Sequence, residues 1–148
     1  MKQLVYVSTA TETLSPRQIS EILQTSRENN RRDDVTGLLI SVEGIFLQVL
    51  EGEADAVDRC FARISQDDRH EGVSVLLDHE VEGRTFGKWA MAYRQPDELG
   101  AEAKESVYRL ADLHGKLGEK IARDPLVANL IGAMVQTVSL PGLHKPVD

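Results

Sequence analysis

The 148-residue sequence predicts an α+β fold with elements in the order β-α-β-β-α-β, followed by one more strand. Three observations predict it. Runs rich in β-branched and aromatic residues have the length of strands, and segments with apolar residues at helical spacing separate them. The pair Glu43-Gly44 stands between two of the strand-like runs, which is typical of a hairpin. This order matches the ferredoxin-like split-βαβ unit, in which the first and third strands lie side by side and two helices cover one face.

The first strand and the first helix have clear sequence signals. Residues 3–8 form the predicted strand, and a polar loop follows it. Ser15 can cap a helix, Pro16 suits its first position, and Gln18 completes a capping box. The helical spacing of apolar residues then predicts a helix that ends near Asn29 and Asn30.

The middle of the chain supplies the remaining elements of the unit. Strands are predicted over residues 36–42 and 45–50, and their weak alternation indicates that both faces of the sheet are covered. A helix over residues 54–66 and a strand over 73–77 follow. Residues 88–93 are expected to form a fifth strand, with Trp89, Met91 and Tyr93 on one face.

The remainder predicts two amphipathic helices, one over residues 101–121 and one opened by Asp124-Pro125 and ended by Pro141-Gly142. Their apolar stripes must be buried, either on the sheet face that the first two helices leave free or on a partner chain. The predicted organisation is therefore a domain at residues 1–95 and a helical extension at 96–148.

Composition excludes several classes of function. A net charge of −7 argues against binding to nucleic acid or to an anionic membrane surface. No apolar run approaches the length of a membrane span, and the N-terminus lacks a signal-peptide pattern. Cys60 is the only cysteine, which excludes an intramolecular disulfide and a thiolate metal cluster. These features predict a cytoplasmic protein without a metal site.

Two polar side chains interrupt strands that are otherwise apolar, Tyr6 in the first and Gln48 in the third. A buried amide costs roughly 1–3 kcal/mol unless it is paired. Because side chains alternate along a strand, Tyr6 shares its face with Ser8, and adjacent central strands can bring Tyr6 to Gln48. Asn29 and Asn30 end the helix above them, so these groups predict a small-ligand pocket. The alternative is that Tyr6 and Gln48 only bond each other.

The joint pattern resembles the BLUF family of blue-light sensors that use a flavin. The resemblance covers roughly residues 2–94 and rests on these segments: Leu4-Val5-Tyr6, Asn29-Asn30, Thr36-Gly37-Leu38-Leu39, Phe46-Leu47-Gln48-Val49-Leu50-Glu51-Gly52, Asp67-Asp68-Arg69-His70 and Trp89-Ala90-Met91. The run from Phe46 to Gly52, in register with an upstream tyrosine, is the most specific of them. Ala90 departs from the serine often found before the family's methionine.

The resemblance implies a role for each matching position. Tyr6 would be the photoactive tyrosine, and Gln48 would bridge it to the flavin ring. Trp89 and Met91 would lie on the strand that responds when the glutamine rearranges. The cofactor would be FAD, with FMN not distinguished, and the residues implied to bind or line it are Ile22, Ser26, Asn29, Asn30, Gln48, Asp67, Arg69 and His70.

These residue types suit light-driven transfer of an electron and a proton from Tyr6, relayed through an amide that both accepts and donates hydrogen bonds. Altered hydrogen bonds of Gln48 would then shift absorption to the red, and the C-terminal helices would pass the change to a separate protein partner or through self-association.

Two alternatives stay open at this stage. The first is a small flavin-dependent enzyme, although the chain offers no convincing pair of nucleophile and base, because its four histidines are scattered. The second is a ligand-free interaction module that dimerises through its terminal helices. A flavin absorption spectrum of the purified protein separates the sensor from this module.

Overall fold

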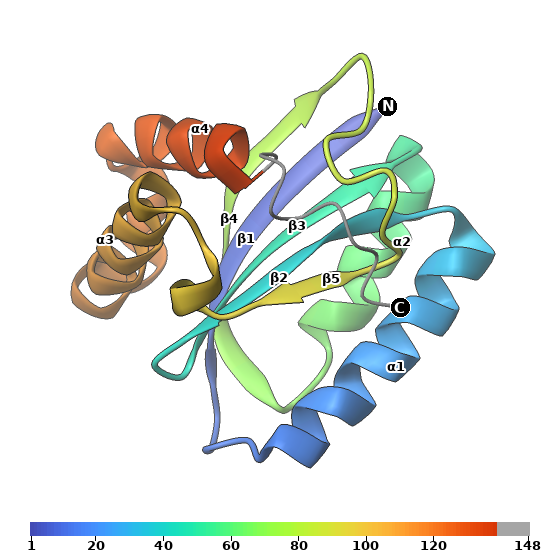
Figure 1. The fold of residues 1–148 in the computed structure, drawn as a ribbon, viewed down its shortest axis with the longest axis horizontal. Coiled ribbons are helices and arrows are strands. Elements are labelled where there is room, and N and C mark those ends of the chain that lie inside the picture. The colour runs from blue at the N-terminus through green and yellow to red at the C-terminus, as the bar shows by residue number, and fades with distance from the viewer. Residues whose placement is uncertain (139–148) are drawn as a thin grey trace.

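The computed structural model describes residues 1–138 and shows a five-stranded sheet with helices on both faces (Figure 1). The strand order is β4-β1-β3-β2-β5, so the first and third strands are neighbours at the centre, as predicted. Two short 3₁₀ helices, η1 and η2, accompany the main elements. In chain order, all the elements are β1 Lys2–Ala10, α1 Pro16–Asp33, β2 Thr36–Val42, β3 Ile45–Gly52, α2 Ala54–Ser65, β4 His70–Glu80, β5 Ala92–Arg94, η1 Pro96–Glu98, α3 Ala101–Leu117, η2 Gly118–Arg123 and α4 Leu126–Val138.

The sheet separates two hydrophobic cores. Helices α1 and α2 cover one face, and α3 and α4 cover the other (Figure 1). The core under α1 and α2 contains Leu4, Tyr6 and Leu50, while the core under α3 and α4 contains Val5, Val7 and Val49. This alternation along β1 and β3 is that of a strand buried on both faces. The predicted packing of the terminal helices on the free sheet face is therefore confirmed. The predicted stop at Pro141-Gly142 lies outside the described residues.

Helix α1 begins as predicted and ends later than predicted. The Gln18 backbone N–H donates to Ser15 Oγ at 3.1 Å, and the Ser15 N–H donates to Gln18 Oε1 at 2.8 Å, which completes the capping box. The helix then continues to Asp33 and closes at Asp34, whose φ of 55° is left-handed. Asn29 and Asn30 therefore lie inside the last turns. The side chain of Asn30 is buried and has tertiary partners, so its preference for helix ends is overridden.

The β2–β3 hairpin sets the position of Gln48. Glu43 and Gly44 have φ values of 49° and 81°, as a two-residue turn of type I′ requires. This turn places Gln48 opposite Leu39 of β2, and the pairing with β1 places it opposite Tyr6.

The predicted fifth strand is present, but it is shorter than predicted and begins four residues later. Only Ala92–Arg94 pair with β2, in parallel, and residues 81–91 are an irregular connection. The predicted common face is wrong, because Trp89 packs in the core under α3 and α4 while Met91 packs with Tyr6. The reason is that the carbonyl groups of Ala90 and Met91 accept from side chains of α1, Asn30 and Arg27, rather than from a neighbouring strand.

Strand β4 begins at His70, earlier than predicted, so this histidine belongs to a strand rather than to a loop. The β1–β4 pairing shifts register between Val7 and Thr9. Such irregularities redirect side chains near binding sites. Here Ser8 and Thr9 bond to partners from different elements: Ser8 Oγ lies 2.8 Å from His70 Nδ1, and Thr9 Oγ1 lies 3.0 Å from Nε2 of His114 on α3.

Gly37 in β2 allows the close approach of β2 and β3. A Cβ at this position would lie 2.0 Å from the carbonyl oxygen of Val49. We expect Gly37→Ala to destabilise the fold by about 3 kcal/mol or more, because backbone must move. Gly115→Ala in α3 is the matched control: it meets no atom within 4 Å, and we expect it to be neutral or slightly stabilising. Urea unfolding of both variants measures this, and equal stabilities would contradict the close-approach argument.

Candidate functional site

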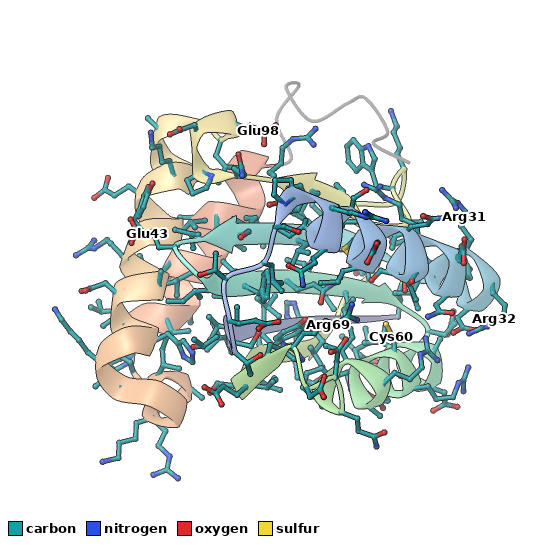
Figure 2. All side chains as sticks on the ribbon, turned by 90° about the horizontal axis from the view of Figure 1, so that it is seen from below. Arg31, Arg32, Glu43, Cys60, Arg69 and Glu98 are labelled. Atoms are coloured by element: carbon teal, nitrogen blue, oxygen red, sulfur yellow. The ribbon has the colours of Figure 1, made fainter. Side chains whose placement is uncertain are left out.

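A cavity of about 160 Å³ lies between the sheet and the helices α1 and α2. A water molecule needs only about 10–15 Å³, so this space suits a larger occupant. Every residue predicted to bind the cofactor lines it, together with Tyr6. These residues are Ile22, Ser26, Asn29, Asn30, Gln48, Asp67, Arg69 and His70. Figure 2 shows Arg69 and Cys60, another lining residue, close to α2 and away from α3 and α4.

Tyr6 and Gln48 are in direct contact at the floor of the cavity. The Tyr6 hydroxyl donates a short hydrogen bond to Gln48 Oε1. The two residues pair across the β1–β3 ladder, and only 3% and 4% of their surfaces are exposed. Burial raises the pKa of the Tyr6 phenol well above its usual value, so the phenol keeps its proton at neutral pH and acts as the donor.

The Gln48 amide also contacts the segment that precedes β5. Its Nε2 donates to the sulfur atom of Met91 at 3.3 Å. A thioether is a weak acceptor, and a primary amide carries two N–H donors. A stronger acceptor in the cavity could therefore take the place of the Met91 sulfur as the partner of Gln48 Nε2.

Asn30 connects α1 to the same segment. Its Nδ2 donates to the carbonyl oxygen of Ala90 at 2.7 Å, and its Oδ1 lies 3.6 Å from the thiol sulfur of Cys60. One N–H of this amide remains after the bond to Ala90. Asn29, on the neighbouring position of α1, is half-buried and lines the cavity.

His70 is fixed by two hydrogen bonds. Its Nε2 lies 2.6 Å from the Ile64 carbonyl oxygen, which can only accept, so this nitrogen carries the proton. Nδ1 lies 2.8 Å from the Ser8 hydroxyl, which can donate to it or accept from it. Ser8 itself does not line the cavity; it orients a residue that does. The His70 ring lies edge-on to Tyr6, with ring centroids 6.2 Å apart.

Charged side chains form the rim of the cavity in pairs. Asp67 bonds the Arg69 guanidinium and also accepts the Arg69 backbone N–H at 2.9 Å. The Arg69 guanidinium holds the pKa of the Asp67 carboxyl below its usual range. Arg63, which also lines the cavity, pairs with Asp33 at 3.0 Å. Among the side chains that the structure describes, no cluster of His, Cys, Asp and Glu is suited to a metal ion.

Three predicted residues, Ser8, Trp89 and Met91, do not line the cavity. Met91 reaches it through Gln48, whereas Trp89 lies on the other side of the sheet. The prediction also missed several lining residues. Phe46 shares the predicted face of Gln48, and Cys60 and Ile64 lie on the apolar face of α2, so strand and helix periodicity could have found them. Thr25, Leu39 and Arg63 carry no distinctive sequence signal.

Comparison with known proteins decides the family. The family of sensors of blue-light using FAD, called BLUF, matches residues 1–92. The chain belongs to the BLUF family. Photoactivated adenylate cyclase subunit beta of Euglena gracilis is 36% identical over 89 residues, which cover 60% of this chain and 10% of that protein. The corresponding subunit of Euglena longa is 32% identical over 115 residues, covering 75% of this chain and 13% of its own.

Solved structures agree with this assignment. A bacterial light-regulated adenylyl cyclase is 34% identical, with a TM-score of 0.71 over 78% of this chain and 35% of that one. The BLUF protein BlrB in its dark state is 24% identical, with a TM-score of 0.71 over 93% of this chain and 94% of its own, and shows the shared fold. The chain spans about a tenth of the length of the curated relatives it matches.

The cavity fits a flavin by the chemistry of its lining. A flavin ring is planar, largely apolar on its faces, and polar along one edge. Leu39, Phe46 and Ile64 supply apolar walls, while Gln48 and Asn30 place amides with remaining hydrogen-bonding capacity beside the same space. A ligand-free module would not need this combination.

The described helices include none that is long and apolar enough to cross a membrane.

The Asp67–Arg69 pair predicts a pH-dependent contribution to stability. Because the pKa of Asp67 is lower in the folded protein, its contribution is present above the unfolded value of 3.8 and is lost as pH falls through the folded value. We expect Asp67→Asn to lower the free energy of unfolding at pH 7 by about 0.5 kcal/mol, since the pair is partly exposed.

Urea unfolding at pH 7 and near pH 3 measures this difference, which should shrink at the lower pH. Asp68→Asn, one residue away, serves as the control and should match the wild type at both pH values. A difference for Asp67→Asn that grows as the pH falls would contradict the assigned direction.

Proposed function

We propose that this chain is a blue-light receptor that binds a flavin non-covalently in the cavity between the sheet and helices α1 and α2. The observation that carries the proposal is the buried contact between Tyr6 and Gln48 at the cavity floor. It joins an oxidisable phenol to an amide that can change its hydrogen-bond partners. The family match to sensors of blue light using FAD supports the same assignment.

A bound flavin supplies a strong oxidant when it absorbs blue light. Tyr6 then gives up one electron and its hydroxyl proton and afterwards regains both, so no net redox change results. Burial raises the pKa of Tyr6, which makes loss of the proton alone unfavourable. The proton therefore does not leave before the electron, and it follows the electron along the existing hydrogen bond to Gln48 Oε1.

After the electron and the proton have returned to Tyr6, Gln48 keeps a changed set of hydrogen bonds. In the structure its carbonyl accepts from Tyr6 and its NH₂ group donates to Met91. Rotation or tautomerisation of the amide would exchange these roles, break the weak bond to Met91 and turn a donor toward the cavity. A hydrogen bond from that donor to a bound flavin would account for a red-shifted absorption.

The signal has two structural routes from the cavity to the face that carries α3 and α4. One is the segment before β5, where Met91 contacts Gln48 on the cavity side and Trp89 belongs to the hydrophobic cluster that α3 and α4 share. The other passes through β1, since Ser8 bonds the cavity residue His70 while adjacent Thr9 bonds His114 of α3.

We propose FAD as the physiological flavin, with FMN also accommodated. The rim arginines Arg63 and Arg69 are each paired with an aspartate, and this favours recognition through the ring rather than through phosphate groups. Output passes to a separate protein or through self-association. Relatives named as photoactivated adenylate cyclases are far longer than this chain, so their activity is not carried over.

The Tyr6→Phe variant tests the proposal directly. We expect it to bind flavin and stay yellow, because the ring keeps its other contacts, and to lose the reversible red shift after blue illumination. Tyr93→Phe is the matched control, since Tyr93 packs in the same core but belongs to β5. Absorption spectra before and after illumination measure both. A normal red shift in Tyr6→Phe, or a wild-type protein that takes up no flavin, would reject the proposal.

Trp89→Ala separates photochemistry from transmission. Because Trp89 lies outside the cavity, we expect the size of the red shift to stay unchanged and the light-induced change in hydrogen exchange of α3 and α4 to fall. Lys88→Ala, at an exposed neighbouring position, is the control. Loss of the red shift in Trp89→Ala would show that this residue acts on the chromophore instead.

A further inference from the structure

We propose that Glu51 is a positioning residue that holds the connecting segment, residues 84–91, in its dark-state arrangement and thereby sets the lifetime of the light-induced state. The part that concerns light rests on the proposed function. The anchoring itself rests on hydrogen bonds that do not involve the cavity.

Glu51 is a completely buried acidic residue, with 0% of its surface exposed. Burying a carboxylate costs several kcal/mol unless its oxygens are well bonded. Here Oε1 accepts the backbone N–H of Phe86 at 2.7 Å, and Oε2 accepts the backbone N–H of Thr85 at 2.8 Å. Gln3 Nε2 also donates to Oε2, at 2.9 Å. Three donors converge on one side chain, and two of them belong to the connecting segment.

The network requires a group that only accepts. An amide at this position would turn an NH₂ group toward one of the three N–H donors. Reversal of the Gln3 amide would not compensate, because either orientation of the new amide would still deprive the Thr85 or the Phe86 backbone N–H of its acceptor. The Glu51 carboxylate is thus stabilised by backbone N–H groups of the connecting segment and by the Gln3 amide, and not by a cationic side chain.

Glu51 anchors the start of the connecting segment. Further hydrogen bonds hold the start and also the far end. Arg84 donates to Thr36 Oγ1 at 2.9 Å and to the Asp34 carbonyl at 2.7 Å. At the far end, successive carbonyl oxygens accept from different donors: Trp89 from the Gly37 N–H at 3.2 Å, Ala90 from Asn30 Nδ2 at 2.7 Å and Met91 from Arg27 Nε at 3.0 Å.

Strand β3 therefore contacts the connecting segment at two points. Gln48 faces the cavity and touches Met91, whereas Glu51, three residues later, faces the other side of the sheet and binds Thr85 and Phe86. Glu51 holds Thr85 and Phe86 in place, and β5 holds the other end of the segment. If Met91 or Trp89 moves, the backbone between these two fixed ends must change its conformation. Glu51 stabilises the arrangement before illumination, so weakening it lowers the relative cost of the light-induced arrangement and slows the return.

The experiment compares Glu51→Gln with the wild type in two measurements on the full chain. The first is hydrogen exchange in the dark, where we expect the Thr85 and Phe86 amides to exchange about 10-fold faster, because one acceptor is lost. The second is recovery after blue light, where we expect a red shift of normal size that decays about threefold more slowly.

Two controls separate positioning from general loss of stability. Glu53→Gln makes the same change at an exposed site and should alter neither measurement. Ile131→Val removes a buried methyl group in α4 and should raise exchange without singling out Thr85 and Phe86. Glu51→Asp, which keeps the charge but shortens the reach, replaces the glutamine variant if the latter does not fold.

Unchanged exchange at Thr85 and Phe86 would overturn the anchoring role. Faster exchange with an unaltered recovery time, or with faster recovery, would overturn its control of the light-induced state. If the wild type itself shows no light response, the proposed function fails separately, and the exchange measurement in the dark still decides whether Glu51 anchors the connecting segment.

Discussion

The structure depends on one cross-strand pair, the hydrogen bond between Tyr6 and Gln48 on the two central strands. Both side chains are almost completely buried, and each would carry an unsatisfied polar group without the other. Satisfying them fixes the register of β1 against β3 and leaves the amide beside an open cavity. A polar pair that stabilises the centre of the fold thus also forms the reactive end of the proposed flavin site.

The sheet can connect the two cores because its strands are buried on both faces. Neighbouring residues on β1 and β3 alternate between the cavity side and the side covered by α3 and α4. Gln48 and Glu51 contact different parts of the connecting segment from opposite faces of β3, and Ser8 and Thr9 bond His70 and His114 from β1. A change at the cavity therefore has short paths to the terminal helices without a hinge between domains.

Acidic residues serve different purposes at the rim of the cavity and beside the connecting segment. At the rim, Asp67 and Asp33 pair with arginines in contact with solvent, and such pairs contribute little to stability. Glu51 is instead buried and bonded to backbone N–H groups, an arrangement in which loss of one partner is costly. This contrast is why we expect modest effects at Asp67 and a specific local effect at Glu51.

The sequence by itself determined the order of the elements, the capped start of α1 and the neighbouring central strands, because strand parity and helix periodicity are local properties. The residues expected to bind the cofactor came instead from the resemblance to the BLUF family, and they omit lining residues such as Leu39 and Arg63. Only the tertiary structure decided the path of residues 81–91, where Trp89 and Met91 separate to opposite sides of the sheet. That path follows from hydrogen bonds to Glu51, Asn30, Arg27 and Gly37, which are distant in sequence. Alternation of large and small residues predicted a strand there, but the partners of a backbone are set by what packs beside it.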